Sequence, residues 1–281
     1  MNGSRHPIYE VIDARRDVRR FRSDPVPEEV LWRLLEAAHH APSVGFMQPW
    51  NFIVVRDAAV KASVKQAFEE ENARAARHYR GRRRALYDSL KLEGIIEAPV
   101  NLCVTCDRSR FGPHVLGRNS MLETDLFSTC CAIQNLWLAA RAEEVGVGWV
   151  SIIQMERLRR ILRVPKRVAI VAYLCVGYPE TWLPQPELEL VGWAPRLPLH
   201  ELVFHDRWGR RDRIGRCGAE VSSRASVTLA GPDAARAPRP SSQYRGSTVL
   251  PEDHGVWKAK GEAPGGRGAP RSAPPANVTA T

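Results

Sequence analysis

Residues 41–52 read Ala-Pro-Ser-Val-Gly-Phe-Met-Gln-Pro-Trp-Asn-Phe and connect a helix-like segment to the apolar run that ends at Val55. Pro42 and Pro49 lack a backbone N–H and have a fixed φ, so this stretch can neither continue the helix nor join a central β-ladder. Gly45 permits a close backbone approach, and amide and aromatic side chains surround it. Such a rigid loop suits a flat, partly polar ring system. Taken alone, however, the stretch is better explained as an ordinary helix-to-strand connection with a few core anchors.

The end of the chain has a different composition. From Gly231 onward, 15 of 51 residues are Pro or Gly, at the low edge of the composition that marks low-complexity sequence. Tyr244 and Trp257 are the aromatic residues there, and no apolar periodicity surrounds them. We therefore predict one folded domain at residues 1–213, long enough to bury a substantial core, followed by a disordered basic tail at residues 214–281.

The net charge is spread over both parts. Nine Lys and Arg against five Asp and Glu give the predicted tail a charge of +4, which leaves +6 of the total +10 for the preceding residues. A basic cluster at residues 77–84 lies on a helix-like segment. No nucleic-acid-binding motif or interleaved aromatic stripe accompanies this cluster, so we expect a solvated helical face and no nucleic-acid partner.

The six cysteines show no metal or redox pattern. Cys103 and Cys106 form Cys-x-x-Cys inside an apolar segment that is typical of a buried strand. A zinc site needs a second pair or nearby histidines, and a redox Cys-x-x-Cys normally opens a helix. We therefore expect buried, reduced thiols and no metal. The chain shows neither a signal-peptide apolar region nor an apolar run of membrane-spanning length, which predicts a soluble, cytoplasmic protein without a membrane partner.

The pattern of helices and strands predicts an α+β fold. Strands are expected at residues 51–55, 100–106, 148–153 and 168–176. Helices are expected at residues 8–16, from Pro27 onward with Val30, Leu31, Leu34, Leu35 and Ala38 facing the core, over residues 58–97 with an interruption near Gly81, and at residues 125–144. The last helix is apolar around much of its circumference, so it is either a buried central helix or a subunit contact. Because helices and strands do not alternate regularly, a doubly wound sheet is not expected.

Three further motifs carry polar groups suited to a ligand. Arg15, Arg16 and Arg19 suit a phosphate through paired donors, although an ion pair is the simpler explanation of Asp17 among them. The stretch at residues 146–151 combines glycines, which allow a backbone to approach a ring, with a serine hydroxyl. A helix-to-strand turn with a glycine cap explains it equally. The third motif is an extended stretch at residues 193–199 with one isolated arginine.

Together and in this order, the motifs resemble the flavin-dependent nitroreductase superfamily over about residues 7–212. They are Arg15-x-Asp17-x-Arg19, residues 41–50, Ser89-Leu-Lys-Leu-Glu-Gly94, Gly148-Trp-Val-Ser151 and Arg196-Leu-Pro198. The resemblance implies a mixed sheet flanked by helices and an interlocked homodimer, with FMN in clefts that use both chains. Arg15, Arg19 and Arg196 match positions that hold the FMN phosphate. The implied FMN-binding set is Arg15, Arg16, Asp17, Val18, Arg19, Ser43, Gly45, Gln48, Leu92, Gly148, Trp149, Ser151 and Arg196.

Asp17 directs the resemblance to one branch of the superfamily, because ordinary nitroreductases usually carry a serine there. In that branch, reduced FMN is the substrate. It is fragmented with O2 to 5,6-dimethylbenzimidazole, the lower ligand of vitamin B12, with erythrose 4-phosphate as the other fragment. The resemblance implies that Asp17 and Ser151 are catalytic, with Asp17 moving protons and Ser151 holding a flavin oxygen or nitrogen. A separate flavin reductase is expected to supply the reduced FMN.

Two other functions remain open at this point. One is an NAD(P)H-dependent nitroreductase or flavin reductase that keeps its FMN. The other is a flavin-binding protein without turnover. The presence of both Asp17 and Ser151 at matching positions favours the fragmenting enzyme over either.

Overall fold

A computed structural model describes residues 5–211. The helices are α1 (Pro7–Ala14), α2 (Glu28–His39), α3 (Ala58–Ala76), α4 (Gly81–Ser89), α5 (Thr124–Ala142), α6 (Met155–Ile161) and α7 (Glu187–Leu190), with 3₁₀ turns η1 (Val44–Phe46) and η2 (Leu199–Glu201). The strands are β1 (Trp50–Val55), β2 (Val100–Asp107), β3 (Gly146–Trp149) and β4 (Val168–Gly177). The predicted tail at residues 214–281 lies outside the described residues.

The four strands form one sheet in the order β1-β2-β4-β3, with antiparallel pairing throughout. In the β1–β2 pair, Trp50 lies opposite Cys106. The β2–β4 register shifts between Val104 and Thr105, which is a bulge. A parallel pairing occurs at the isolated bridge between Asp17 and Val147, where the N-terminal segment reaches β3.

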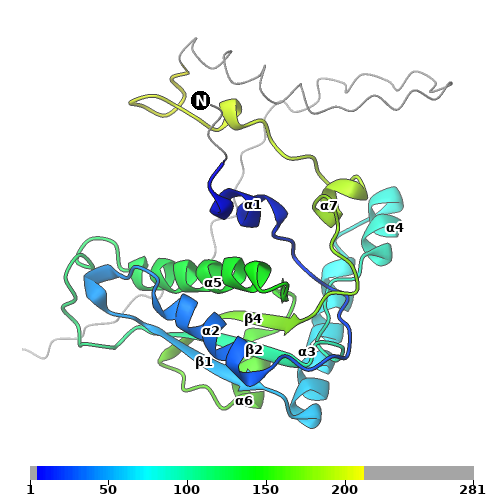
Figure 1. The fold of residues 1–281 in the computed structure, drawn as a ribbon, viewed down its shortest axis with the longest axis horizontal. Coiled ribbons are helices and arrows are strands. Elements are labelled where there is room, and N and C mark those ends of the chain that lie inside the picture. The colour runs from blue at the N-terminus through cyan, green and yellow to red at the C-terminus, as the bar shows by residue number, and fades with distance from the viewer. Residues whose placement is uncertain (1–4, 212–281) are drawn as a thin grey trace, which may run out of the picture. The chain divides into compact units, whose positions relative to one another are not determined.

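Both faces of the sheet contribute residues to the core. Successive strand residues point to opposite sides, so each strand supplies residues to both faces. Leu102 and Leu174 belong to the core shared with α2 and α5, whereas Cys103 and Tyr173 belong to the core shared with α3 and α6. Figure 1 shows α5 running along the sheet and α6 lying on the other side of it. The α+β prediction is confirmed. The helix predicted at residues 125–144 is present as α5, which buries one face and leaves Phe127, Cys130 and Cys131 exposed.

Several predicted boundaries need correction. Pro27 is the N-cap of α2 and not its first helical residue, because its ψ of 145° is extended while its carbonyl accepts the first helical hydrogen bond from Leu31. The helical region predicted to reach residue 97 ends at Ser89, because the backbone becomes extended at Leu90. The strand predicted at residues 148–153 occupies Gly146–Trp149. Val150 still donates to the Tyr173 oxygen of β4 at 2.9 Å, but the ladder ends there, and Val150 and Ile153 pack in the core.

The cysteines of the described residues match the prediction of buried, reduced thiols only in part. Cys103, Cys106 and Cys175 are buried and free, as expected for a strand, whereas Cys130 and Cys131 on α5 are free and exposed. Within residues 5–211, no helix combines the length and apolarity needed to cross a membrane. In the same range, no group of three or more His, Cys, Asp and Glu gathers in a way that could hold a metal ion.

Candidate active site

The segment at residues 15–19 lies against the edge of β3. Its bridge to β3 includes a hydrogen bond from Val18 N to the Val147 oxygen of 3.0 Å. A Cβ at Gly148 would lie 2.0 Å from the Val18 oxygen, so any larger residue there would push this segment away. Gly148 is therefore required by close backbone contact, which places Asp17 beside the end of β3.

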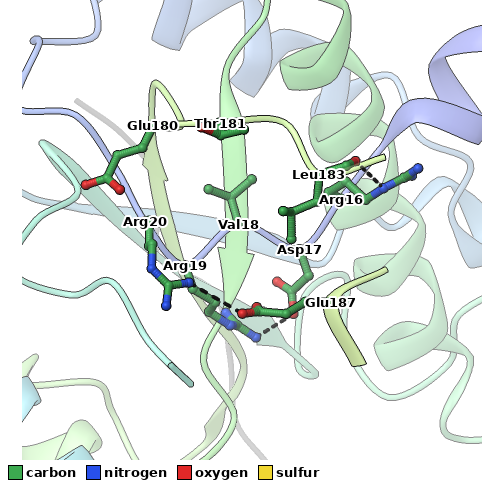
Figure 2. A pocket seen from close by; sticks show the side chains of 9 residues that line it. All are labelled: Arg16, Asp17, Val18, Arg19, Arg20, Glu180, Thr181, Leu183 and Glu187. Carbon is green, nitrogen blue, oxygen red and sulfur yellow. Dashed lines mark hydrogen bonds and ion pairs between the residues drawn. The ribbon is translucent and has the colours of Figure 1, made fainter. Parts of the chain in front are cut away.

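Asp17 is held by two contacts on its two oxygens. Its Oδ1 accepts the Trp149 backbone N–H at 2.9 Å, and its Oδ2 pairs with Arg19 Nη2. The same Arg19 nitrogen donates to the Trp149 carbonyl at 2.8 Å. Figure 2 shows the Asp17–Arg19 pair among the side chains that line a depression, which come from residues 16–20 and from the chain after β4. The ion pair expected from the sequence is present, and it also fixes the carboxylate orientation.

The environment of Asp17 raises its pKa above the ordinary value of an aspartate. Withdrawal from water is the main cause, and the charge of Arg19 and the Trp149 N–H act in the opposite direction. The side chain nevertheless keeps 44% of its surface exposed, because it lines two adjoining depressions. Asp17 is thus a recessed but accessible carboxyl, which is the arrangement that proton transfer to a ligand requires.

Arg19 has donor capacity left over. Its Nη1 is buried, and among residues 5–211 no acceptor faces it. A buried guanidinium N–H without a partner is costly, so an anionic group bound here would relieve that cost. The spare donor of Arg19 therefore suits an anionic group such as a phosphate.

The other two arginines of this motif are placed differently. Arg16 donates from Nε to the Leu183 oxygen at 3.0 Å and from Nη2 to the Pro184 oxygen at 2.5 Å. Its Nη1 also donates to the backbone, so Arg16 acts mainly as a tie between the N-terminal segment and residues 183–184. Arg15 stacks over the Trp137 ring at 4.9 Å and lines the second depression.

Two depressions meet at Asp17. The first has a volume of about 100 Å³ and the second about 190 Å³. The second is lined by Arg15, Asp17, Arg19 and Leu92, all predicted from the sequence, together with Lys91 and Glu187. Sequence reasoning missed the last two, because Lys91 lies inside a recognised motif without a distinctive role and Glu187 lies in a short helix far along the chain. Glu187 forms an ion pair of 3.4 Å with Arg20.

The loop at residues 43–48, which we call the proline-flanked loop, lines neither of these depressions. It holds three of the predicted residues: Ser43, Gly45 and Gln48. The Ser43 hydroxyl accepts the Gln48 N–H at 3.0 Å, and the Val44 N–H donates to Ser128 Oγ on α5 at 3.0 Å. Gly45 has a φ of +51°, which favours glycine, so its place in the motif has a backbone reason.

Ser151 and Arg196 complete the predicted set. Ser151 is exposed and lies two residues beyond Trp149, after β3 has ended. Arg196 is exposed. Burial lowers the pKa of Arg16, and the charges of Arg15, Arg141 and Arg196 lower it further. Arg15 and Arg16 line the depressions, and Arg196 is close enough to Arg16 for their charges to interact. One chain thus brings together Arg15 to Arg19, Leu92, Gly148 and Trp149, and it keeps the proline-flanked loop apart from them.

Comparison with known proteins places this architecture in a family. A family model described as the nitroreductase family matches residues 12–178, more than half of the chain. The chain therefore belongs to the nitroreductase family. Within this family, it is similar to the 5,6-dimethylbenzimidazole synthase of Rhodospirillum rubrum, with 47% identity over 189 residues that cover 67% of this chain and 89% of the relative. The protein of the same name from Rhodobacter capsulatus is 43% identical over 194 residues, which cover 69% and 94% of the two chains.

Solved structures agree on the fold. Iodotyrosine deiodinase bound to FMN and 3-iodo-L-tyrosine has a TM-score of 0.57 and 24% identity, and the alignment covers 71% of this chain and 98% of that one. NADPH:FMN oxidoreductase from Vibrio harveyi has a TM-score of 0.55 and 19% identity, with 78% and 85% covered. At these identities the likeness concerns the fold alone.

Proposed function

We propose that this protein is an oxidoreductase that fragments reduced FMN with O2 to 5,6-dimethylbenzimidazole and erythrose 4-phosphate. Its similarity to two 5,6-dimethylbenzimidazole synthases, each covered over most of its length, supports this reaction. The observation in the site that carries the proposal is the carboxylate of Asp17, fixed by the Trp149 N–H and Arg19 beside an unpaired buried donor. Reduced FMN supplies the carbon skeleton and the electrons, and O2 is the oxidant.

Asp17 moves protons in this proposal. Its raised pKa keeps the carboxyl protonated to a higher pH than an ordinary aspartate, so the group is better suited to exchange a proton near neutrality. Each oxygen already has a partner, so protonation weakens the contact to Arg19 or to Trp149. Trp149 and Arg19 thereby return the carboxyl to one orientation after each proton transfer. Ser151, two residues beyond Trp149, contributes a hydroxyl that holds a flavin oxygen or nitrogen.

The phosphate is held by arginines. Arg19 supplies the free buried N–H, and Arg15 and Arg196 add positive charge nearby. Because Arg16 is engaged by backbone carbonyls, it holds the arginine segment in place and contributes mainly its charge. Leu92, Gly148 and Trp149 then lie where the flavin ring is expected.

A homodimer is part of the proposal. Members of the nitroreductase family are commonly dimers. Each depression on one chain is smaller than the roughly 300–1,000 Å³ of most ligand pockets. The proline-flanked loop contacts α5 at Ser128, whereas the arginine segment contacts it at Trp137. Nine helical residues separate these points by ~13 Å along the axis. A second copy that contributes its Ser43, Gly45 and Gln48 would complete the site.

A product assay tests the proposed reaction. The purified full-length protein is loaded with reduced FMN without O2, exposed to air, and analysed by mass spectrometry. We expect the flavin to disappear and 5,6-dimethylbenzimidazole to form. Recovery of intact oxidised FMN with peroxide would refute the proposal and favour a nitroreductase, if NADPH oxidation with a nitroaromatic acceptor is also seen, or a flavin-binding protein if it is not. A cytoplasmic location and a separate reductase that supplies reduced FMN are further parts of the proposal.

A further inference from the structure

The proline-flanked loop has a strained backbone. Three of its residues lie in the left-handed region: Gly45 at φ +51°, Phe46 at +53° and Gln48 at +47°. Residues other than glycine rarely adopt this backbone conformation, and it persists where the surroundings enforce it. Phe46 is 76% exposed, so the packing of its own side chain does not enforce this conformation. Part of the restraint is internal, through the hydrogen bond from the Gln48 N–H to Ser43 Oγ, and the rest comes from the segments that touch the loop.

Two segments supply that restraint. The first is the connection between β2 and α5 at residues 108–123, which we call the 108–123 loop. Its Arg110 donates from Nη1 to the carbonyl oxygens of Gln48 and Trp50, and from Nη2 to Asn51 Oδ1 at 2.5 Å. Its Leu116 backbone lies so close that a Cβ on Gly45 would stand 2.7 Å from the Leu116 oxygen.

The second segment is the first part of α5. Ser128 Oγ accepts the Val44 N–H at 3.0 Å and donates to the Thr124 oxygen at 2.6 Å. The proline-flanked loop is therefore held between α5 on one side and the 108–123 loop on the other. Its shape depends on how firmly these two are joined to each other.

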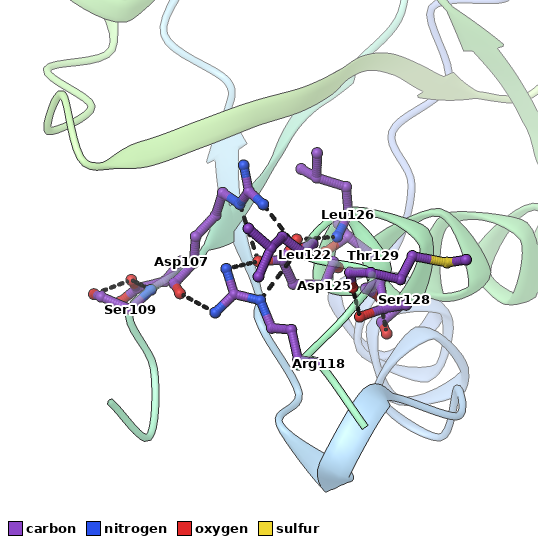
Figure 3. Close-up of polar contacts among 11 residues, drawn as sticks. Asp107, Ser109, Arg118, Leu122, Asp125, Leu126, Ser128 and Thr129 are labelled. Atoms are coloured by element: carbon purple, nitrogen blue, oxygen red, sulfur yellow. Dashed lines mark hydrogen bonds and ion pairs between the residues drawn. The ribbon is translucent and has the colours of Figure 1, made fainter. Parts of the chain in front are cut away.

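Asp125 makes that junction. It is fully buried, and its Oδ2 lies 3.0 Å from Arg108 Nε and 2.8 Å from Arg118 Nη2. Both arginines also donate to the Leu122 oxygen, at 2.8 and 3.1 Å, and Arg118 donates to the Arg108 oxygen at 3.0 Å. Figure 3 shows Arg118 and Leu122 gathered around Asp125 at the start of α5. One carboxylate oxygen thus ties the first residue of the 108–123 loop, Arg108, and its Arg118 to the helix.

We propose that Asp125 is a positioning residue for the proline-flanked loop. Its charge holds Arg108 and Arg118, the two arginines hold the 108–123 loop, and Arg110 and Leu116 of that loop keep residues 43–48 in their left-handed shape. Loss of the charge leaves two guanidinium groups without their anion, so the loop detaches from α5. The consequence for ligand binding rests on the proposed function, because residues 43–48 are there expected to line the flavin ring. The effect on the loop itself does not.

Hydrogen exchange of the FMN-free protein, followed by mass spectrometry, tests the effect on the loop. Asp125→Asn keeps the size of the side chain and removes its charge. Ser128→Ala removes the acceptor of the Val44 N–H, together with the donor to the Thr124 oxygen, and leaves Asp125 in place. We expect amide exchange in the peptide of residues 43–48 to accelerate about tenfold or more in Asp125→Asn, and by a smaller factor in Ser128→Ala. The matched control is Asp88→Asn, which removes an exposed i,i+4 ion pair with Arg84 and should leave this peptide unchanged. Unchanged exchange at residues 43–48 in a folded Asp125→Asn protein would overturn the proposal.

Two further measurements keep the test decisive. If Asp125→Asn does not fold, Arg118→Gln, which removes one of the two ion pairs, takes its place. Amide exchange at residues 43–48 should again accelerate, and unchanged exchange would overturn the proposal. FMN affinity, measured by flavin fluorescence quenching, should fall about fivefold or more in Asp125→Asn and stay unchanged in Asp88→Asn. Faster exchange with unaltered FMN affinity would overturn the ligand-side consequence. Failure of the wild-type protein to bind FMN would overturn the proposed function, while the exchange result would still decide the role of Asp125.

Discussion

The segment at residues 15–19 and the proline-flanked loop together carry eight of the thirteen predicted FMN-binding residues, and the protein holds them in opposite ways. The arginine segment pairs its backbone with β3 and leaves charged groups accessible: a recessed carboxylate at Asp17 and a spare donor on Arg19. The proline-flanked loop contains no charged residue and has a strained backbone. It is held from outside by Arg110 and, as we propose, by Asp125.

This difference suggests a division of roles, in which the arginine segment carries the reactive groups and the proline-flanked loop supplies a surface of fixed shape. A segment that lies along a strand keeps its side chains in defined positions without strain, so it is suited to carry groups that react. A loop in a rare conformation offers a fixed surface of backbone and amide groups, and its cost must be met by neighbouring interactions. Mutations in the first region should therefore change rate or anion affinity, and mutations in the second should change stability and fit.

The largest effect is expected from Asp17→Asn. The variant keeps the size and one acceptor of the side chain but cannot exchange a proton, so formation of 5,6-dimethylbenzimidazole should fall about 10²–10⁴-fold. Affinity for reduced FMN should change only a few-fold. Single-turnover assays after air exposure measure the rate, and Asp24→Asn, which alters an exposed ion pair with Arg22, is the control. A full rate in Asp17→Asn would remove Asp17 from the chemistry.

The next effect concerns the spare donor on Arg19. Hydrogen bonds to charged groups contribute about 1.5–3 kcal/mol, so Arg19→Gln should weaken FMN binding roughly 10–150-fold. Riboflavin has no phosphate, so its affinity should change much less. Titrations of both flavins measure the difference, with Arg56→Gln, at an exposed ion pair with Glu28, as the control. Equal losses for the two flavins would mean that Arg19 acts on the shape of the site and not on the phosphate.

The third prediction compares the loss of folding stability when alanine replaces Gly45 in the proline-flanked loop or Gly81 outside it. Gly45 and Gly81 both have a φ of +51°, but only Gly45 is crowded, since its Cβ would meet the Leu116 backbone while nothing lies within 4 Å of a Cβ at Gly81. Alanine at either site costs about 1–2 kcal/mol for the backbone conformation. At Gly45, overpacking should add about 1–3 kcal/mol. Urea unfolding of Gly45→Ala and Gly81→Ala measures both, and equal losses would show that the 108–123 loop yields easily.

The smallest effect is a pH dependence. The pKa of Asp17 is raised in the folded protein, so its contribution to stability is fully present below the pKa of the unfolded chain and is lost as the pH rises through the folded pKa. Asp17→Asn does not titrate, so its thermal midpoint relative to wild type should increase between pH 4 and pH 7. Thermal unfolding at each pH measures this difference. A relative midpoint that decreases over the same range would mean that Arg19 and the Trp149 N–H lower the pKa of Asp17 below its ordinary value.

Much of the fold followed from local patterns in the sequence. The apolar spacing in α2 and α5 predicted their buried faces, and the apolar segment around Cys103 predicted a buried strand. The boundaries were less predictable. Val150 and Ile153 extended the apparent strand beyond Trp149, because burial in a core and pairing in a sheet favour the same residue types.

The site was predictable only in part, for a similar reason. The motifs predicted Asp17 and Arg19 as site residues, and the structure shows what each of them contacts. Arg110 and Asp125 gave no such signal, because a lone arginine or aspartate has many possible partners. In the sequence, Asp125 is an ordinary acidic residue in the first turn of a helix. Only the structure shows Arg108 and Arg118 beside it.

The sequence by itself determined the residue types, the glycines and prolines at positions of special backbone geometry, and the order of the motifs, because these depend on covalent structure and on near neighbours. Only the tertiary structure decided which arginine keeps an unused hydrogen-bond donor. Arg16 and Arg19 are alike in sequence, yet Arg16 meets backbone carbonyls 167 and 168 residues away, and Arg19 meets the carbonyl of Trp149, 130 residues away, and keeps one buried donor unpaired. The hydrogen-bonding capacity left to a guanidinium depends on the carbonyls that the folded chain places around it.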